Sequence, residues 1–153
     1  MLKLAFDLDE TLGVPLIAGA EIVGWQARPG SVELLTALQS QFTLCLWSVS
    51  SRRYVDKALS FGLSRWFQKT FSWDDIAEPW KDVRRIGASF LVDDSPHHRG
   101  AARKHGLEAA YIVVPAYGSP EDTLDPLGWK AQVERTLQGG HHGNLGSEQL
   151  PRR

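Results

Sequence analysis

Apolar residues along the chain gather into short runs, and the segments between these runs show helical spacing. Within the first run, from Leu2 to Leu8, every second residue is a large apolar one, which predicts a strand. Later runs are continuously apolar, which is typical of strands buried on both faces of a parallel sheet. Strands are therefore predicted over residues 2–8, 42–47, 70–71, 89–92 and 110–114.

The segments that separate these runs predict helices. After Ser31, a candidate N-cap, the residues Val32, Leu35 and Leu38 recur on one helical face. Further helices are predicted around residues 54–59, 97–105 and 127–137, with a helical turn at 81–87. Strands that alternate with helices indicate a three-layer, Rossmann-like α/β fold with a mainly parallel central sheet.

Two segments depart from this alternation. Residues 14–27 hold two short apolar patches around Ala18-Gly19-Ala20, which predicts a β-hairpin flap over about residues 12–27. From Gly139 onward the chain is rich in Gly and His and lacks a core pattern, so residues 139–153 are expected to form a mobile tail. The chain is thus predicted to be one domain over residues 1–138, with no large cap domain.

Composition narrows the setting. The 153 residues are enough for one core, and a net charge of −1 gives no support for a broad nucleic-acid footprint. The single cysteine, Cys45, excludes an intramolecular disulfide and fits a reducing, cytoplasmic compartment. No apolar stretch approaches membrane-spanning length, and charged residues from Lys3 to Glu10 interrupt the first run, so we expect neither a membrane span nor a signal peptide.

Acidic residues follow two of the predicted strands. Asp7 and Asp9 end the first apolar run, and Asp93 and Asp94 follow the run at 89–92. Either pair alone could be a turn or a helix cap, since Asp favours both. Ligands of open α/β sheets bind beyond the carboxyl ends of the strands, where two such pairs would meet. Carboxylate oxygens favour a hard cation, so the pattern predicts a Mg²⁺ site.

Other polar residues complete a set suited to phosphoryl transfer, which needs a nucleophile, an acid/base and groups that screen the phosphate. An Asp nucleophile would form an aspartyl-phosphate, and a second Asp two positions later could protonate the leaving oxygen. Thr11 and Ser48 can donate hydroxyl hydrogen bonds, and Lys81 supplies positive charge.

Taken in order, these residues resemble the four motifs of the haloacid dehalogenase (HAD) superfamily. Asp7-Leu8-Asp9-Glu10-Thr11 has the D-x-D-x-T pattern of motif one. The later motifs are matched by Ser48, by Lys81 and by Asp93-Asp94. The match covers about residues 2–138, and four motifs in the same order make it specific.

Within this superfamily the chain resembles the branch of the RNA polymerase II C-terminal-domain phosphatases. That branch shares the surroundings Arg28-Pro29-Gly30, Lys81-Asp82 and an acidic pair followed by Ser95-Pro96. The chain is also similar to the small magnesium-dependent phosphatases. The resemblance implies a phosphatase that hydrolyses phosphomonoesters with Mg²⁺.

The resemblance also implies roles for single residues. Asp7 would be the nucleophile and Asp9 the general acid/base. The metal would be held by Asp7, by the backbone carbonyl of Asp9 and by an acid of motif four. Asp94 occupies a position that is often Asn in the branch, and we expect it to be the direct ligand, with Asp93 acting directly or through water.

The substrate stays open at this point. Ser48 and Lys81 are predicted to bind the phosphate, and Trp25 and Arg52 are candidates for contact with the rest of the substrate. The segments between motifs are too short for a cap, and an open site suits a phosphate on a protein or at a nucleic-acid end. A small-metabolite or nucleotide phosphatase and a polynucleotide 3′-phosphatase are alternatives, as are two non-enzymes, a phospho-accepting receiver domain and a phosphopeptide-binding module.

Overall fold

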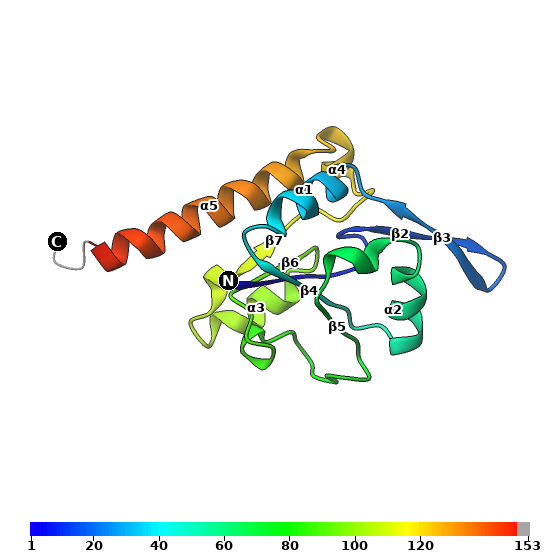
Figure 1. Ribbon diagram of the computed structural model, residues 1–153, viewed down its shortest axis with the longest axis horizontal. Helices are drawn as coiled ribbons and strands as arrows, with labels where there is room; N and C mark the ends of the chain where they lie inside the picture. Colours follow the sequence, from blue (N-terminus) through cyan, green and yellow to red (C-terminus); the bar gives the residue numbers. More distant parts are fainter. Residues whose placement is uncertain (150–153) are drawn as a thin grey trace.

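The computed structural model of the protein describes the backbone of residues 1–149 and the side chains of residues 1–139. Its centre is a parallel sheet of five strands in the order β5-β4-β1-β6-β7 (Figure 1). The strands are β1 (Lys3–Phe6), β4 (Thr43–Trp47), β5 (Lys69–Phe71), β6 (Phe90–Asp93) and β7 (Tyr111–Val113). The predicted α/β class and the five predicted strands are confirmed.

Strand β1 lies in the middle of the sheet and pairs on both sides. Its last residue, Phe6, is in register with Leu46 of β4 and with Val92 of β6. All of these pairings are parallel, so the loops that follow β1, β4 and β6 leave the sheet at the same edge. This edge is where a site of an open α/β sheet is expected.

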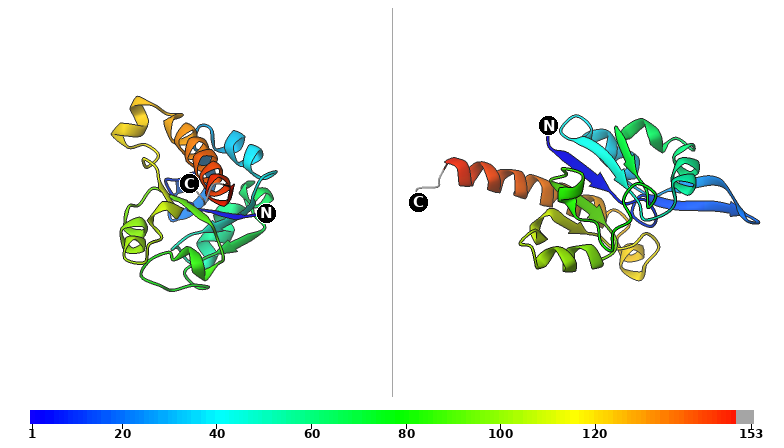
Figure 2. Two further views of the ribbon diagram at one scale, coloured as in Figure 1. Left: turned by 90° about the vertical axis from the view of Figure 1, so that its left-hand side faces the viewer. Right: turned by 90° about the horizontal axis from the view of Figure 1, so that it is seen from below.

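Helices cover both faces of the sheet, which gives the three predicted layers (Figure 2). Helices α1 (Ser31–Leu38), α2 (Arg52–Leu59) and α5 (Gly128–Gln149) pack on the face that carries Leu4 and Phe6. The other face carries Ala5 and is covered by α3 (His97–Arg103) and by the 3₁₀-helix Val83–Arg85. Two further 3₁₀-helices are Leu63–Trp66 and Glu108–Ala110. Among the described residues, no helix has the length and apolar character needed to cross a membrane.

The predicted flap is present as an antiparallel hairpin of β2 (Gly13–Ala18) and β3 (Glu21–Ala27). Its two-residue turn contains Gly19 in the left-handed region, with φ 64°, which a glycine adopts without strain. The hairpin projects from the body of the protein, on the side away from the far end of α5 (Figure 1). Within residues 1–149 it is the insertion between β1 and α1, and no cap domain accompanies it.

Three details differ from the sequence-based expectations. The N-cap of α1 is Gly30 rather than Ser31, because the chain turns there through the left-handed region with φ 85°. Helix α4 (Pro120–Leu124) was not predicted, although Ser119 caps it and Pro120 occupies its first turn. Helix α5 extends to Gln149, into the segment expected to be a tail; residues 150–153 of that segment lie outside the described part.

Candidate active site

Three carboxylates converge at the carboxyl ends of β1 and β6. Asp7 follows β1 directly, Asp93 is the last residue of β6, and Asp94 comes next. Each offers one oxygen such that the three oxygens lie within 4.8 Å of one another. The neighbouring parallel strands thus bring together acids that are more than 80 positions apart in the sequence.

Lys81 reaches this cluster from the loop that precedes the 3₁₀-helix Val83–Arg85. Its Nζ lies 2.8 Å from Asp7 Oδ1 and 2.8 Å from Asp93 Oδ2, and its side chain is 3% exposed. Burial by itself lowers the pKa of an ammonium group, but the two carboxylates outweigh it, so the pKa of Lys81 is raised. Lys81 therefore stays protonated and holds both carboxylates in place.

Thr11 is fully buried and links motif one to motif four. Its hydroxyl lies 3.0 Å from Asp7 Oδ2 and 3.0 Å from Asp94 Oδ1, so it can donate to one of them at a time. The same oxygen accepts a hydrogen bond from the backbone N–H of Asp94, at 3.1 Å. Thr11 thus positions the two carboxylates.

The acidic cluster has more negative charge than its single ammonium can balance. Burial raises the pKa of Asp94 to about 7, and the nearby carboxyl of Asp7 contributes in the same direction. Burial and repulsion from Asp7 also raise the pKa of Asp93, while Lys81 offsets part of that rise. A group of carboxylates that resists ionisation in this way is one that a divalent cation would stabilise.

The donor set fits Mg²⁺, because every side-chain donor is a carboxylate oxygen and the oxygens are close enough to share one ion. Asp93 already accepts from Lys81 through Oδ2 and from the backbone N–H of Ser95 through Oδ1. Asp94 has one oxygen beside Thr11 and none held by a cation. This difference favours Asp94 over Asp93 as a direct ligand.

Asp9 lies apart from the three clustered acids and has a different partner. It accepts a hydrogen bond from the hydroxyl of Tyr54, which lies on α2. Burial raises the pKa of Asp9, and the bond from Tyr54 opposes the rise in part. A carboxyl with a raised pKa holds a proton closer to neutral pH, which suits a general acid. The sequence placed Tyr54 on a buried helix face. A buried tyrosine hydroxyl needs a hydrogen-bond partner, and this need was the sequence signal for the contact with Asp9.

Ser48 follows β4 and lies at the same edge of the sheet, where it is buried. Its Oγ accepts from the backbone N–H of Ser50 at 3.0 Å, so its own proton is free to be donated. An open pocket of about 520 Å³ brings these side chains together. The predicted residues that line it are Asp7, Asp9, Ser48, Lys81, Asp93 and Asp94.

Two predicted substrate contacts lie elsewhere. Trp25 packs at the base of the hairpin, where a Cβ added to Gly13 would meet its Nε1 at 2.5 Å. The guanidinium of Arg52 is held by Asp56, Asp75 and Thr70 on the outside of α2. Neither residue lines the pocket, so neither is placed to touch a substrate there in this structure.

A buried arginine fixes the backbone of motif one from behind. Arg28 donates to the carbonyl oxygens of Glu10 and Thr11, both at 3.3 Å, and to that of Pro115 at 2.6 Å. It also pairs with Asp122 of α4 at 3.0 Å, and its side chain is fully buried. The sequence did not predict the pairing of Arg28 with Asp122, because the two residues lie 94 positions apart.

The backbone that Arg28 holds has an unfavourable conformation at Glu10. Glu10 has φ 64°, the one non-glycine residue with positive φ among those described. A second bond, from the N–H of Tyr117, also holds the Glu10 carbonyl. Residues in this region are strained and persist where their surroundings over-determine them. The Arg28–Asp122 pair therefore supports the conformation that presents Asp7 and Asp9.

His98 supports Lys81 in a similar way. Its Nδ1 accepts a hydrogen bond from the backbone N–H of Lys81 at 2.9 Å, and its Nε2 lies 3.8 Å from Asp93 Oδ2. Burial lowers the pKa of His98 to about 4, and Lys81 contributes to that shift, so the ring is neutral at pH 7. The sequence placed His98 at a helix start after Pro96 and gave no signal for its contact with Lys81.

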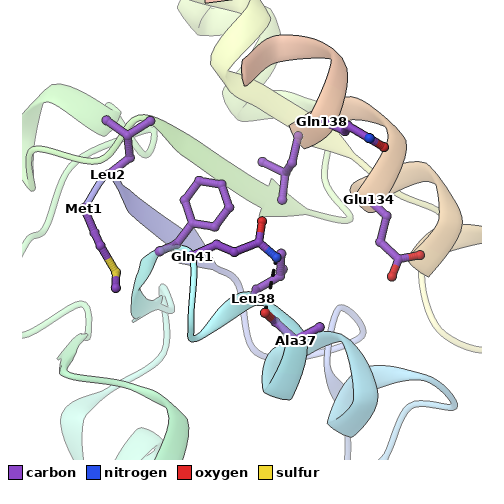
Figure 3. Close-up of a pocket in the computed structure, with 9 residues that line it drawn as sticks. Met1, Leu2, Ala37, Leu38, Gln41, Glu134 and Gln138 are labelled. Carbon is purple, nitrogen blue, oxygen red and sulfur yellow. Dashed lines mark hydrogen bonds between the residues drawn. The ribbon is translucent and has the colours of Figure 1, made fainter. Parts of the chain in front are cut away.

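A larger groove of about 980 Å³ lies at the opposite end of the strands (Figure 3). Leu2 and Phe42 flank the starts of β1 and β4, and Leu38 of α1 and Glu134 of α5 complete its walls. Its lining is mainly apolar and contains no cluster of acids. The chemistry-bearing residues are therefore in the smaller pocket.

No protein-family model matches this chain, and no curated protein matches it by sequence. Solved structures do match its fold. A β-phosphoglucomutase-like protein from Thermotoga maritima has a TM-score of 0.58 and 15% identity, over 82% of this chain and 91% of its own. The likeness is thus one of backbone architecture.

Two structures of Fcp1, an RNA polymerase II C-terminal-domain phosphatase, also match. One has a TM-score of 0.60 and 17% identity and covers 94% of this chain. The other, a fission yeast variant bound to beryllium fluoride, has a TM-score of 0.56 and 16% identity and covers 76%. The matched regions span about half of each Fcp1 chain, 53% and 42%. The protein has the fold of the haloacid dehalogenase superfamily, as its motifs predicted.

The raised pKa of Asp94 makes the stability of the fold depend on pH. A carboxyl whose pKa is higher in the folded than in the unfolded protein destabilises the fold as pH rises between the two values. For Asp94 this window runs from 3.8 to about 7. Without metal, Asp94→Asn should therefore raise Tm more at pH 8 than at pH 5, and Mg²⁺ should shrink that difference. The lowered pKa of His98 makes stability rise with pH. This contribution is the same in the wild-type protein and in Asp94→Asn, so it cancels when the two are compared.

Thermal unfolding of both proteins at the two pH values, in chelator and in Mg²⁺, measures this effect. The exposed residue Asp56 on α2 provides a matched control, Asp56→Asn, which makes the same chemical change away from the acidic cluster. An Asp94→Asn effect of equal size at pH 5 and pH 8 would contradict the assignment of the pKa shift to that carboxyl.

Proposed function

We propose that the protein is a Mg²⁺-dependent phosphatase that hydrolyses a phosphomonoester through a phosphorylated Asp7. The observation that carries this proposal is the arrangement of Asp7, Asp93 and Asp94 around the Nζ of Lys81. Asp9 lines the same pocket and has a raised pKa. The HAD fold and the order of its four motifs support the same reading.

In the proposed reaction a carboxylate oxygen of Asp7 attacks phosphorus, and the bond from phosphorus to the leaving oxygen breaks. The carboxyl of Asp9 gives its proton to that oxygen. Asp9, now ionised, takes a proton from water as the water attacks the phosphorus of the aspartyl-phosphate. The bond to Asp7 breaks, which releases inorganic phosphate and restores both carboxyl groups.

Other side chains orient this chemistry. Lys81 holds Asp7 through Oδ1, Thr11 lies beside Oδ2, and Ser48 has a hydroxyl proton available for a phosphate oxygen. Tyr54 fixes the carboxyl of Asp9. Mg²⁺ held by Asp7, Asp94 and the backbone carbonyl of Asp9, with Asp93 direct or through water, would neutralise charge on the transferring phosphoryl group.

We further propose that the phosphate is carried on a macromolecule or is otherwise exposed, because the pocket is open and the described chain has no cap. The raised pKa of Asp9 and its hydrogen bond from Tyr54 support a general acid/base, and hence turnover rather than the receiver and binding-module alternatives. The buried lone thiol of Cys45 supports a reducing compartment such as the cytoplasm.

The metal requirement provides the test of this function. Chelation should abolish hydrolysis of p-nitrophenyl phosphate, and added Mg²⁺ should restore it. Asp94→Ala should weaken the apparent Mg²⁺ affinity by about tenfold or more, by loss of a carboxylate ligand. Asp9→Asn should leave that affinity nearly unchanged, because Asp9 is expected to bind through its backbone, while it lowers kcat.

Titration of activity and of Mg²⁺ binding separates these effects. Full activity in chelator would refute the metal-dependent proposal. An unchanged Mg²⁺ affinity in Asp94→Ala, together with a loss in Asp93→Ala, would instead assign the direct ligand to Asp93.

A further inference from the structure

The mouth of the active-site pocket is acidic beyond the catalytic cluster. Glu10 and Glu78 also line the pocket, whereas its one lysine, Lys81, is buried and already holds two carboxylates. Within the part of the chain whose side chains are described, no arginine lines this pocket. Apart from His97 and His98, the titratable side chains that a substrate meets around its non-phosphate part are therefore acids.

These outer acids are weakly neutralised. The carboxylate of Glu10 is exposed and forms no hydrogen bond or ion pair with another described side chain. Glu78 pairs with Arg85 at 3.2 Å, but both side chains are about half exposed, so solvent screens the pair. By contrast, Lys81 and Mg²⁺ would balance the three inner carboxylates. The net charge that remains at the mouth is negative.

The loop that carries Glu78 also presents an aromatic surface. Trp73 is 45% exposed and lines the pocket beside Val49, which is 53% exposed. The face of an exposed tryptophan attracts Lys and Arg side chains through cation–π interaction. The nearby guanidinium of Arg52 is occupied by Asp56 and Asp75, so it leaves this surface without a competing cation.

We infer that the preferred substrate is a phosphopeptide with Lys or Arg next to the phosphorylated residue. This inference rests on the proposed phosphatase function and specifies its substrate class. The basic side chain contacts Trp73 and the carboxylates of Glu10 and Glu78, which line the same pocket, while the phosphate enters toward Asp7 and Lys81. A nucleic-acid end brings further phosphates to the same acids and is repelled.

The test compares phosphoserine peptides of equal length whose neighbours are Arg, Ala or Glu, together with a 3′-phosphorylated oligonucleotide and phosphocholine. p-Nitrophenyl phosphate serves as the reference in every protein. We expect kcat/KM to follow the order Arg, Ala, Glu, with the Arg and Glu peptides about tenfold apart. The preference should fall when salt rises from about 0.05 M to about 0.5 M.

Substitutions then locate the preference. Glu10→Gln and Glu78→Gln should each reduce the ratio of kcat/KM between the Arg and Glu peptides about two- to threefold, and the double variant should nearly remove it. Glu33→Gln, an exposed acid in the first turn of α1, is the matched control and should change neither the ratio nor the activity on the reference substrate. If a variant does not fold, the salt dependence of the wild-type protein still tests the inference.

The outcomes distinguish this inference from the proposed function. Hydrolysis of the reference substrate with no order among the peptides would overturn the inference and leave the phosphatase intact. The oligonucleotide or phosphocholine as the best substrate would also overturn it. Failure of the wild-type protein to hydrolyse the reference substrate would refute the proposed function and, with it, this inference.

Discussion

Asp7→Asn is expected to lower kcat for p-nitrophenyl phosphate by at least about a thousandfold, because an amide cannot act as the nucleophile. The fold should persist. The side-chain oxygen of asparagine can still accept from Lys81, and its amide can donate to the hydroxyl of Thr11. Removal of one negative charge from the crowded cluster should leave Tm unchanged or higher.

Steady-state kinetics and thermal unfolding together check this expectation. Asp56→Asn, on the exposed side of α2, makes the same chemical change away from the pocket and should retain activity. Rapid acid quench should trap a phosphorylated wild-type protein and none in Asp7→Asn. An Asp7→Asn protein that retains near-wild-type kcat would rule out Asp7 as the nucleophile.

Arg28→Met is expected to destabilise the protein by about 3–5 kcal/mol, as removal of one partner of a buried ion pair does. The substitution leaves the carboxylate of Asp122 buried without its cation and removes a donor from each of three carbonyl oxygens. Two of these carbonyls, those of Glu10 and Thr11, belong to the loop that presents Asp7 and Asp9. Protein that still folds at low temperature should therefore have a reduced kcat with intact secondary structure.

A double-mutant cycle with Asp122→Leu separates the ion pair from the packing of Arg28. The double variant should be less destabilised than the sum of the two single variants, because no unpaired charge remains. Denaturant unfolding provides the free energies. Arg28→Lys is a useful conservative variant, since one ammonium cannot reach three carbonyls and a carboxylate together. Full stability of Arg28→Met would show that the clamp does not hold the loop.

The loop that follows β1 is held by different groups on its two sides. The front of the motif-one loop carries carboxylates that repel one another and that a metal would stabilise. The back of the same loop is held by a cation, Arg28, which also lies over the ring of Trp129 at 4.5 Å. Helix α5 is thereby coupled to the loop through packing. Substitutions at Trp129 should consequently affect the site as well as the core.

Much of the fold could be predicted from the sequence, because burial requires apolar residues at regular positions along the chain. The continuous apolar runs at β4 and β6 predicted strands that are covered on both faces of the sheet. The segments with helical spacing were the elements available to cover those faces. The hairpin was legible for a similar reason, since two apolar patches flank a glycine that can adopt positive φ. Helix α4 was overlooked because it is short and exposed, with Asp122 as its buried residue.

By itself the sequence indicated candidate residues for the chemistry, because reaction type depends on functional groups and on the short spacing of Asp7 and Asp9. It also determined that acids end two buried strands. Only the tertiary structure decided which groups those acids meet. Lys81, Tyr54 and Arg28 reach the loop from distant segments, and their partners follow from how helices and loops pack on the sheet. Such contacts depend on the positions of whole elements in space, which no local spacing encodes.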